Sequence, residues 1–109
     1  AVKFETFLFD ALPAAGRTVT MEVRREDMFS PIKNAEGPDS AATARRDLNR
    51  MYARWLKAAG VTVPRGPDGE PVDLEIDPRF ALDADELARR LPPGLSIGGP
   101  TVIPPAATP

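Results

Sequence analysis

The sequence contains no cysteine and no histidine among its 109 residues. Without cysteine, the chain cannot form a disulfide, a thiolate zinc site or a cysteine nucleophile. Without histidine, it lacks the Ser-His-Asp triad, the commonest metal ligand and the usual general base at neutral pH. The residues of this chain therefore exclude several large classes of enzyme site.

Long apolar runs and an excess of charge are also missing. No run approaches the roughly 18 apolar residues of a membrane span, and no signal peptide opens the chain. Fourteen basic and sixteen acidic residues give a net charge of −2, which creates no general attraction to nucleic acid or to anionic membranes. The glycines form neither a GxGxxG nor a GxxxxGK phosphate loop. We therefore expect a cytoplasmic protein with no membrane or nucleic-acid partner.

Proline is abundant and unevenly placed. The chain has thirteen prolines, and six of them fall in residues 92–109. The composition changes after Gly60, because residues 61–90 carry eight acidic residues and several turn-forming prolines and glycines. We expect a small α+β unit with a proline-rich tail, divided into residues 1–60 and residues 61–109.

The first half is predicted to contain three elements. Residues 1–12 are strongly apolar without a clean period and favour a buried helix ended by Pro13 and Gly16, with a buried strand as the alternative. Residues 18–25 alternate and are rich in β-branched side chains, which predicts a strand with Val19, Met21 and Val23 toward the core. In residues 40–59 the apolar side chains recur every three or four positions, as in an amphipathic helix. Asp39 or Ser40 can cap its start, and Gly60 suits its end.

The second half is predicted to contain short elements. Residues 72–77 alternate as a strand, with Val72, Leu74 and Ile76 facing inward. Residues 83–91 favour a short helix capped by Asp83. Three further short strands are expected at residues 61–63, 95–97 and 101–103.

The loop after residue 28 holds the strongest candidate for chemistry. Lys33 lies between Pro31 and Asn34, where a long cationic side chain can reach a phosphate as a point charge. A solvated surface lysine is the alternative interpretation. Phe4, Phe7 and Phe9 can stack on a sugar or a base, although aromatic side chains more often fill a core.

Two other groups of charged side chains are weaker candidates. Asp10 and Glu22 are too few to define a metal site. Arg46, Arg50 and Arg54 are spaced four apart on the polar face of the predicted helix. They fit a solvated helix face better than an RNA-binding surface.

Four blocks in order resemble the C-terminal portion of the UDP-sugar pyrophosphorylase family, with the greatest likeness to the enzymes for UDP-N-acetylhexosamines. The blocks are Phe4-Glu-Thr-Phe-Leu-Phe-Asp10, Met21-Glu-Val-Arg-Arg-Glu-Asp27, Phe29-Ser-Pro-Ile-Lys-Asn-Ala35 and Thr43-Ala-Arg45. A fainter likeness continues through Leu74-Glu-Ile-Asp-Pro78 and beyond. The resemblance implies an α/β fold, in which residues 1–60 end a Rossmann-like nucleotidyltransferase domain and residues 61–109 form a small β-rich appendage.

The resemblance also implies a reaction and a site. Such an enzyme joins UTP to a sugar 1-phosphate, giving a UDP-sugar and pyrophosphate, with Mg²⁺ as cofactor. Phe7 and Phe9 would border the sugar pocket, and Lys33, with Asn34 beside it, would contact the phosphates of the substrate. The family's Gly-rich nucleotide loop and the Mg²⁺ ligands are absent from these residues. We therefore expect the rest of the enzyme as a partner and no activity from this segment alone.

A function of another class stays open on the sequence. The chain can instead be a non-catalytic interaction or accessory module. In that case the apolar face of residues 1–12 would dock onto a partner protein, because so apolar a surface is unusual on a free monomer.

Overall fold

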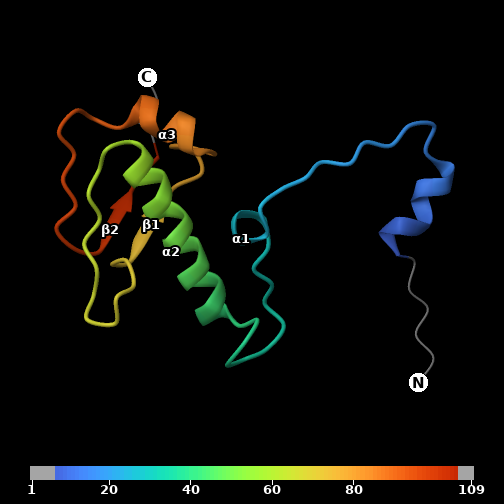
Figure 1. Ribbon diagram of the computed structural model, residues 1–109, viewed down its shortest axis with the longest axis horizontal. Coiled ribbons are helices and arrows are strands. Elements are labelled where there is room, and N and C mark those ends of the chain that lie inside the picture. The colour runs from blue at the N-terminus through green and yellow to red at the C-terminus, as the bar shows by residue number, and fades with distance from the viewer. Residues whose placement is uncertain (1–6, 106–109) are drawn as a thin grey trace.

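The computed structural model describes residues 7–105, and a single long helix organises them (Figure 1). Helix α2 spans Ala41–Ala58, so the helix predicted over residues 40–59 is confirmed. Ser40 is its N-cap, and its hydroxyl accepts a hydrogen bond from the Thr43 backbone N–H. Gly60 follows the helix with φ +82°, a left-handed conformation that glycine adopts without a steric penalty.

The other regular elements of the C-terminal half form a strand–helix–strand unit. Strand β1 (Leu74–Ile76) is followed by helix α3 (Ala84–Arg90) and strand β2 (Thr101–Ile103). The two strands are parallel, with Leu74 opposite Thr101 and Ile76 opposite Ile103. Parallel neighbours need such a crossover connection, which agrees with an α/β class. The Asp83 carboxylate caps α3 by accepting a hydrogen bond of 2.7 Å from the Glu86 N–H, as the sequence predicts.

One small hydrophobic core joins α2 to this unit. Its buried side chains come from residues before and after residue 60 in the sequence. Leu56 of α2 and Leu87 of α3 have no exposed surface. The full set is Leu56, Val61, Leu74, Ile76, Ala81, Leu87, Ile97 and Ile103. The division into residues 1–60 and 61–109 stays a prediction, but α2 packs as one body with the strand–helix–strand unit.

Helix α2 also satisfies the free edge of β1. The Asn49 side chain is buried; its Oδ1 accepts from the Leu74 N–H at 3.2 Å, and its Nδ2 donates to Asp73 Oδ1 at 3.0 Å. One turn later, the Tyr52 hydroxyl donates to the Ile76 carbonyl at 3.3 Å. These bonds replace the missing neighbour strand, so the orientation of α2 on the sheet is fixed by polar as well as apolar contacts.

Two of the predicted short strands are wrong. Residues 61–63 and residues 95–97 are not strands, although Val61 and Ile97 are buried. A strand needs a neighbour for its backbone hydrogen bonds, and the sheet found in residues 7–105 has only β1 and β2. The apolar side chains at these positions reach the core from irregular backbone.

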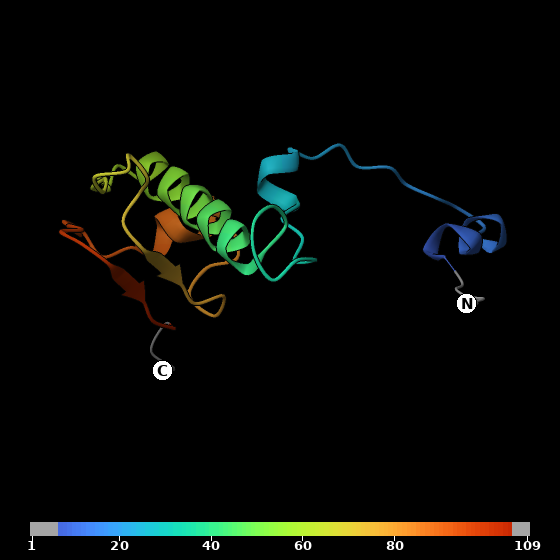
Figure 2. The ribbon, with the colours of Figure 1, turned by 90° about the horizontal axis from the view of Figure 1, so that it is seen from below.

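The predicted buried N-terminal helix is confirmed only in part, because the helix that forms is a short 3₁₀ helix and is exposed. Residues 1–6 lie outside the described residues. Leu8–Ala14 form an exposed 3₁₀ helix, η1, which contains Pro13 and buries no residue. Within the described residues, η1 packs against no other element, and both views place it apart from α2 and the sheet (Figures 1 and 2).

The strand expected at residues 18–25 does not form. The chain is extended there without a partner strand, and Val19, Met21 and Val23 are exposed. One helical turn, α1 (Arg25–Met28), begins at the end of this stretch. The alternating pattern describes a strand that could be half buried in a sheet, but residues 7–105 supply no sheet beside it.

Candidate functional site

Residues 30–40, here called the Lys33 loop, run from α1 to the start of α2 and close on themselves. The backbone N–H groups of Lys33 and Asn34 both donate to the Asp39 carbonyl, at 2.6 and 3.0 Å. The Asn34 side-chain Nδ2 donates to the Pro38 carbonyl at 2.7 Å. The Lys33 side chain is exposed. The loop therefore presents its lysine to solvent from a backbone that internal hydrogen bonds restrain.

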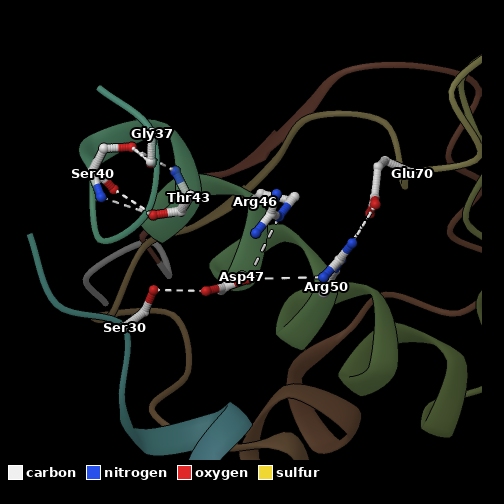
Figure 3. Close-up of polar contacts among 8 residues, drawn as sticks. All are labelled: Ser30, Gly37, Ser40, Thr43, Arg46, Asp47, Arg50 and Glu70. Atoms are coloured by element: carbon white, nitrogen blue, oxygen red, sulfur yellow. Dashed lines mark hydrogen bonds and ion pairs between the residues drawn. The ribbon is translucent and has the colours of Figure 1, made fainter. Parts of the chain in front are cut away.

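The C-terminal end of the Lys33 loop is fixed by the cap of α2 (Figure 3). Ser40 is fully buried, and its hydroxyl donates to the Gly37 carbonyl at 2.7 Å. The Thr43 hydroxyl accepts from the Ser40 N–H at 2.9 Å, which completes a reciprocal capping box. This end of the loop thus shares its hydrogen bonds with the first turn of the helix.

The N-terminal end of the loop is fixed to the second turn of the same helix. The Ser30 hydroxyl donates to Asp47 Oδ2 at 2.7 Å, a contact that joins residues 17 positions apart (Figure 3). The other oxygen, Asp47 Oδ1, faces Arg46 Nε at 3.7 Å and Arg50 Nη1 at 3.9 Å. Both ends of the Lys33 loop are therefore tied to one helix.

Arg50 extends these contacts across α2. Its guanidinium binds both carboxylate oxygens of Glu70, with Nε donating to Oε2 at 2.8 Å. The hydrogen bonds from Arg50 lower the pKa of Glu70 below its usual value, and Glu70 raises the pKa of Arg50 in turn. Two hydrogen bonds between one guanidinium and one carboxylate fix the relative orientation of the two side chains as well as pairing their charges.

Glu70 also makes a testable contribution to the pH dependence of stability. A carboxyl group whose folded-state pKa is lowered stabilises the fold above its unfolded pKa, and this stabilisation disappears as the pH falls through the folded-state pKa. We expect Glu70→Gln to lower the free energy of unfolding slightly at pH 7. The difference from the parent chain should vanish in acid, as followed by urea unfolding at a series of pH values.

Glu36→Gln, at an exposed position of the Lys33 loop, is the matched control and should shift stability little at any pH. A destabilisation by Glu70→Gln that persists unchanged into acid would contradict the role of the ion pair.

Helix α1 is also held on α2. Arg54 pairs with Asp27, which also lies 3.6 Å from Arg24 Nε. The Arg25 guanidinium stacks 4.1 Å from the ring centre of Phe29. Arg46, Arg50 and Arg54, predicted to form a solvated helix face, are thus each in contact with a carboxylate.

An open hollow of about 260 Å³ lies between the start of the Lys33 loop and α2. Arg25, Arg46, Ser30 and Thr43 line it together with Asp39 and Asp47. Cationic and hydroxyl groups are the donors that suit a phosphate, whereas the two carboxylates make the hollow mixed in charge.

The structure does not bring all the predicted site residues together. Phe7 and Phe9 are 60% and 65% exposed, with ring centres 5.5 Å apart, but they sit at η1, away from the Lys33 loop. Asn34 uses its side-chain nitrogen to close that loop. Sequence reasoning missed Ser30 and Asp47 as anchors of the loop. Their spacing carries no signal that would have found them.

Neither a metal-binding cluster nor a membrane-spanning helix is found in residues 7–105. These residues contain no group of three or more acidic side chains placed to hold a metal ion. None of their helices has the length and apolar character that crossing a membrane requires.

Comparison with known proteins identifies relatives by sequence. The chain is 44% identical over 88 residues to UDP-N-acetylglucosamine diphosphorylase 2 of Arabidopsis thaliana, which covers 79% of this chain and 18% of that protein. It is 36% identical over 101 residues to UDP-N-acetylhexosamine pyrophosphorylase-like protein 1 of Homo sapiens, covering 79% of this chain and 20% of that protein. Matches that cover 79% of 109 residues must include the Lys33 loop and α2.

A weaker match is to a protein whose name indicates a different activity. L-rhamnose mutarotase of Burkholderia ambifaria is 32% identical over 79 residues, covering 70% of this chain and 73% of that protein. No family model matches the chain, and no solved structure does.

Seven relatives, from one plant, a slime mould, a nematode and three vertebrates, carry UDP-N-acetylglucosamine or UDP-N-acetylhexosamine diphosphorylase or pyrophosphorylase names. Their agreement confirms the likeness that the four sequence blocks indicate. The chain is therefore related in sequence to the UDP-sugar pyrophosphorylase family, as a segment that spans about a fifth or less of the length of the relatives it matches.

Proposed function

We propose that this chain is the C-terminal segment of a uridylyltransferase that makes a UDP-N-acetylhexosamine. The enzyme would join UTP to a sugar 1-phosphate and release pyrophosphate. The observation that carries the proposal is the 44% identity over 88 residues to a UDP-N-acetylglucosamine diphosphorylase. The complete enzyme would consist of this chain together with the remaining part that its relatives contain.

Lys33 supplies the chemistry of this segment. In the reaction, an oxygen of the sugar phosphate attacks the α-phosphorus of UTP, and the bond to pyrophosphate breaks. Negative charge builds up on the phosphoryl oxygens in the transition state, and a fixed cation beside them lowers its energy. The exposed Lys33 ammonium, on a loop tied to α2 at both ends, has the charge and the restraint for this task.

The exposed apolar side chains of residues 7–32 support the need for the rest of the enzyme. η1 and the extended stretch after it expose phenylalanine, leucine, valine and methionine side chains, a surface unusual on a free domain. In the complete enzyme we expect residues 18–25 to join the sheet of a Rossmann-like domain. Phe7 and Phe9 would then border the sugar pocket. Residues 61–109 would be an appendage to that domain.

Mg²⁺ belongs to the proposal only as the cofactor of the complete enzyme. Its ligands are expected outside this segment, in the part of the enzyme that the resemblance places before these residues. When bound, the ion would neutralise phosphate charge. A cytoplasmic location likewise stays a prediction.

A chimera tests the proposal. The 88-residue matched segment of the Arabidopsis relative is replaced by the corresponding residues of this chain, and UDP-N-acetylglucosamine formation from UTP and N-acetylglucosamine 1-phosphate is measured. We expect the chimera to be active and a version lacking the segment to be inactive. A chimera that elutes and melts like its parent but makes no UDP-sugar would contradict the proposal.

Sugar anomer interconversion is the second candidate, because the chain spans 73% of the mutarotase relative. It predicts that the 109-residue chain alone speeds the exchange of L-rhamnose anomers, which NMR saturation transfer detects. The absence of histidine removes the most common acid–base group at neutral pH and favours the first proposal.

A further inference from the structure

The Lys33 loop is connected to α2 by two kinds of contact with different consequences. At its C-terminal end, the buried Ser40 forms the helix cap, which the fold needs in order to begin α2. At its N-terminal end, the Ser30–Asp47 hydrogen bond lies at the surface, outside the hydrophobic core. The second contact holds the loop without being required to build the helix.

The carboxylate of Asp47 is held from two sides, by the Ser30 hydroxyl and by two arginines of α2. Aspartate is a weak helix former inside a helix, and Asp47 sits in the second turn of α2, beyond the cap. Its carboxylate is oriented from the other side by Arg46 and Arg50, and Arg50 is held in turn by Glu70. A chain of contacts therefore runs from Glu70 through Arg50 and Asp47 to Ser30, three residues before Lys33 (Figure 3).

We propose that Asp47 is a positioning residue for Lys33: by accepting the Ser30 hydroxyl hydrogen bond, it fixes the start of the loop and sets where the lysine ammonium meets the substrate phosphates. This inference rests on the proposed phosphate role of Lys33. A displaced cation stabilises the transition state less, and small misplacements of a catalytic group reduce rates strongly. Asp47 itself does not touch the substrate.

The test is steady-state kinetics of the complete enzyme with Asp47→Ala, Ser30→Ala and the double variant. We expect each single change to lower kcat by about tenfold with a smaller change in KM, and the double variant to be no worse than either, because both remove one hydrogen bond. Asp47→Asn keeps an oxygen that can accept from Ser30 and should restore part of the activity. Asp77→Asn, which breaks an exposed pair with Arg79, is the control.

Making the same changes in a Lys33→Ala enzyme shows whether Asp47 acts by positioning Lys33 or only by stabilising the fold. If Asp47 acts through Lys33, then Asp47→Ala should reduce kcat no further once the lysine is gone. An equal loss in both backgrounds would overturn the inference, as would full activity of Asp47→Ala and Ser30→Ala in an enzyme that Lys33→Ala impairs. Full activity of Lys33→Ala would instead overturn the proposed role of Lys33.

Discussion

Replacing Leu56 by alanine is expected to lower the free energy of unfolding by about 2–5 kcal/mol. Leu56 has no exposed surface and belongs to the one cluster that joins α2 to the buried side chains of β1, α3 and β2. Alanine would remove three carbons and leave a cavity that a core of eight residues has little freedom to fill. Domains of this size are stable by only about 5–15 kcal/mol, so the loss is a large fraction of the total.

Urea unfolding measures this effect through the fluorescence of Trp55, the only tryptophan, one residue away. Leu82→Ala is the matched control: Leu82 is 73% exposed, and the same change there should cost under about 1 kcal/mol. Equal midpoints for the two variants would mean that α2 does not pack on the sheet as described.

Local sequence signals were enough for the elements that depend mainly on themselves. The apolar period of residues 40–59 found α2, and the capping residues Ser40 and Asp83 marked the starts of two helices. Strand β1 was found because Leu74 and Ile76 alternate with an exposed Glu75. For the two helices the neighbours that decide the structure lie within a few residues, whereas β1 also depends on its pairing with the distant strand β2.

The failures share a physical cause. Residues 18–25 carry a strand pattern, but a strand forms only beside another, and no neighbour lies within residues 7–105. The apolar run that includes Phe7 and Phe9 indicated burial, yet the structure exposes it. Both patterns are those of segments that pack against further protein, which is what the proposed enzyme would supply.

The residues of the candidate site likewise fall into those that the sequence predicts and those that only the folded structure reveals. Lys33 and Asn34 stood out by residue type and by resemblance, because both lie in one short block of sequence. The Ser30–Asp47 contact could not be predicted, since it depends on which face of α2 turns toward a loop 17 residues earlier. That rotation is set by the buried contacts of Leu56 and Asn49, which only the folded chain reveals.

Lys33→Ala in the complete enzyme is expected to lower kcat by about 10²–10³-fold, the usual loss when a group that stabilises developing charge is removed. Folding should be almost unaffected, because the side chain is exposed and the loop is closed by the Lys33 backbone N–H, which alanine keeps. Initial rates with UTP and N-acetylglucosamine 1-phosphate, together with a thermal unfolding curve, measure the two effects separately.

Two variants make the Lys33 result specific. Lys57→Ala removes another exposed lysine, at the far end of α2, and should leave the rate unchanged. Lys33→Arg keeps the charge but changes the length and shape of the donor, so it should retain more activity than alanine without full recovery. If Lys33→Ala and Lys57→Ala had the same kcat, the ammonium of Lys33 would not act on the phosphates. The function of this segment would then lie in binding the rest of the enzyme through its exposed apolar residues.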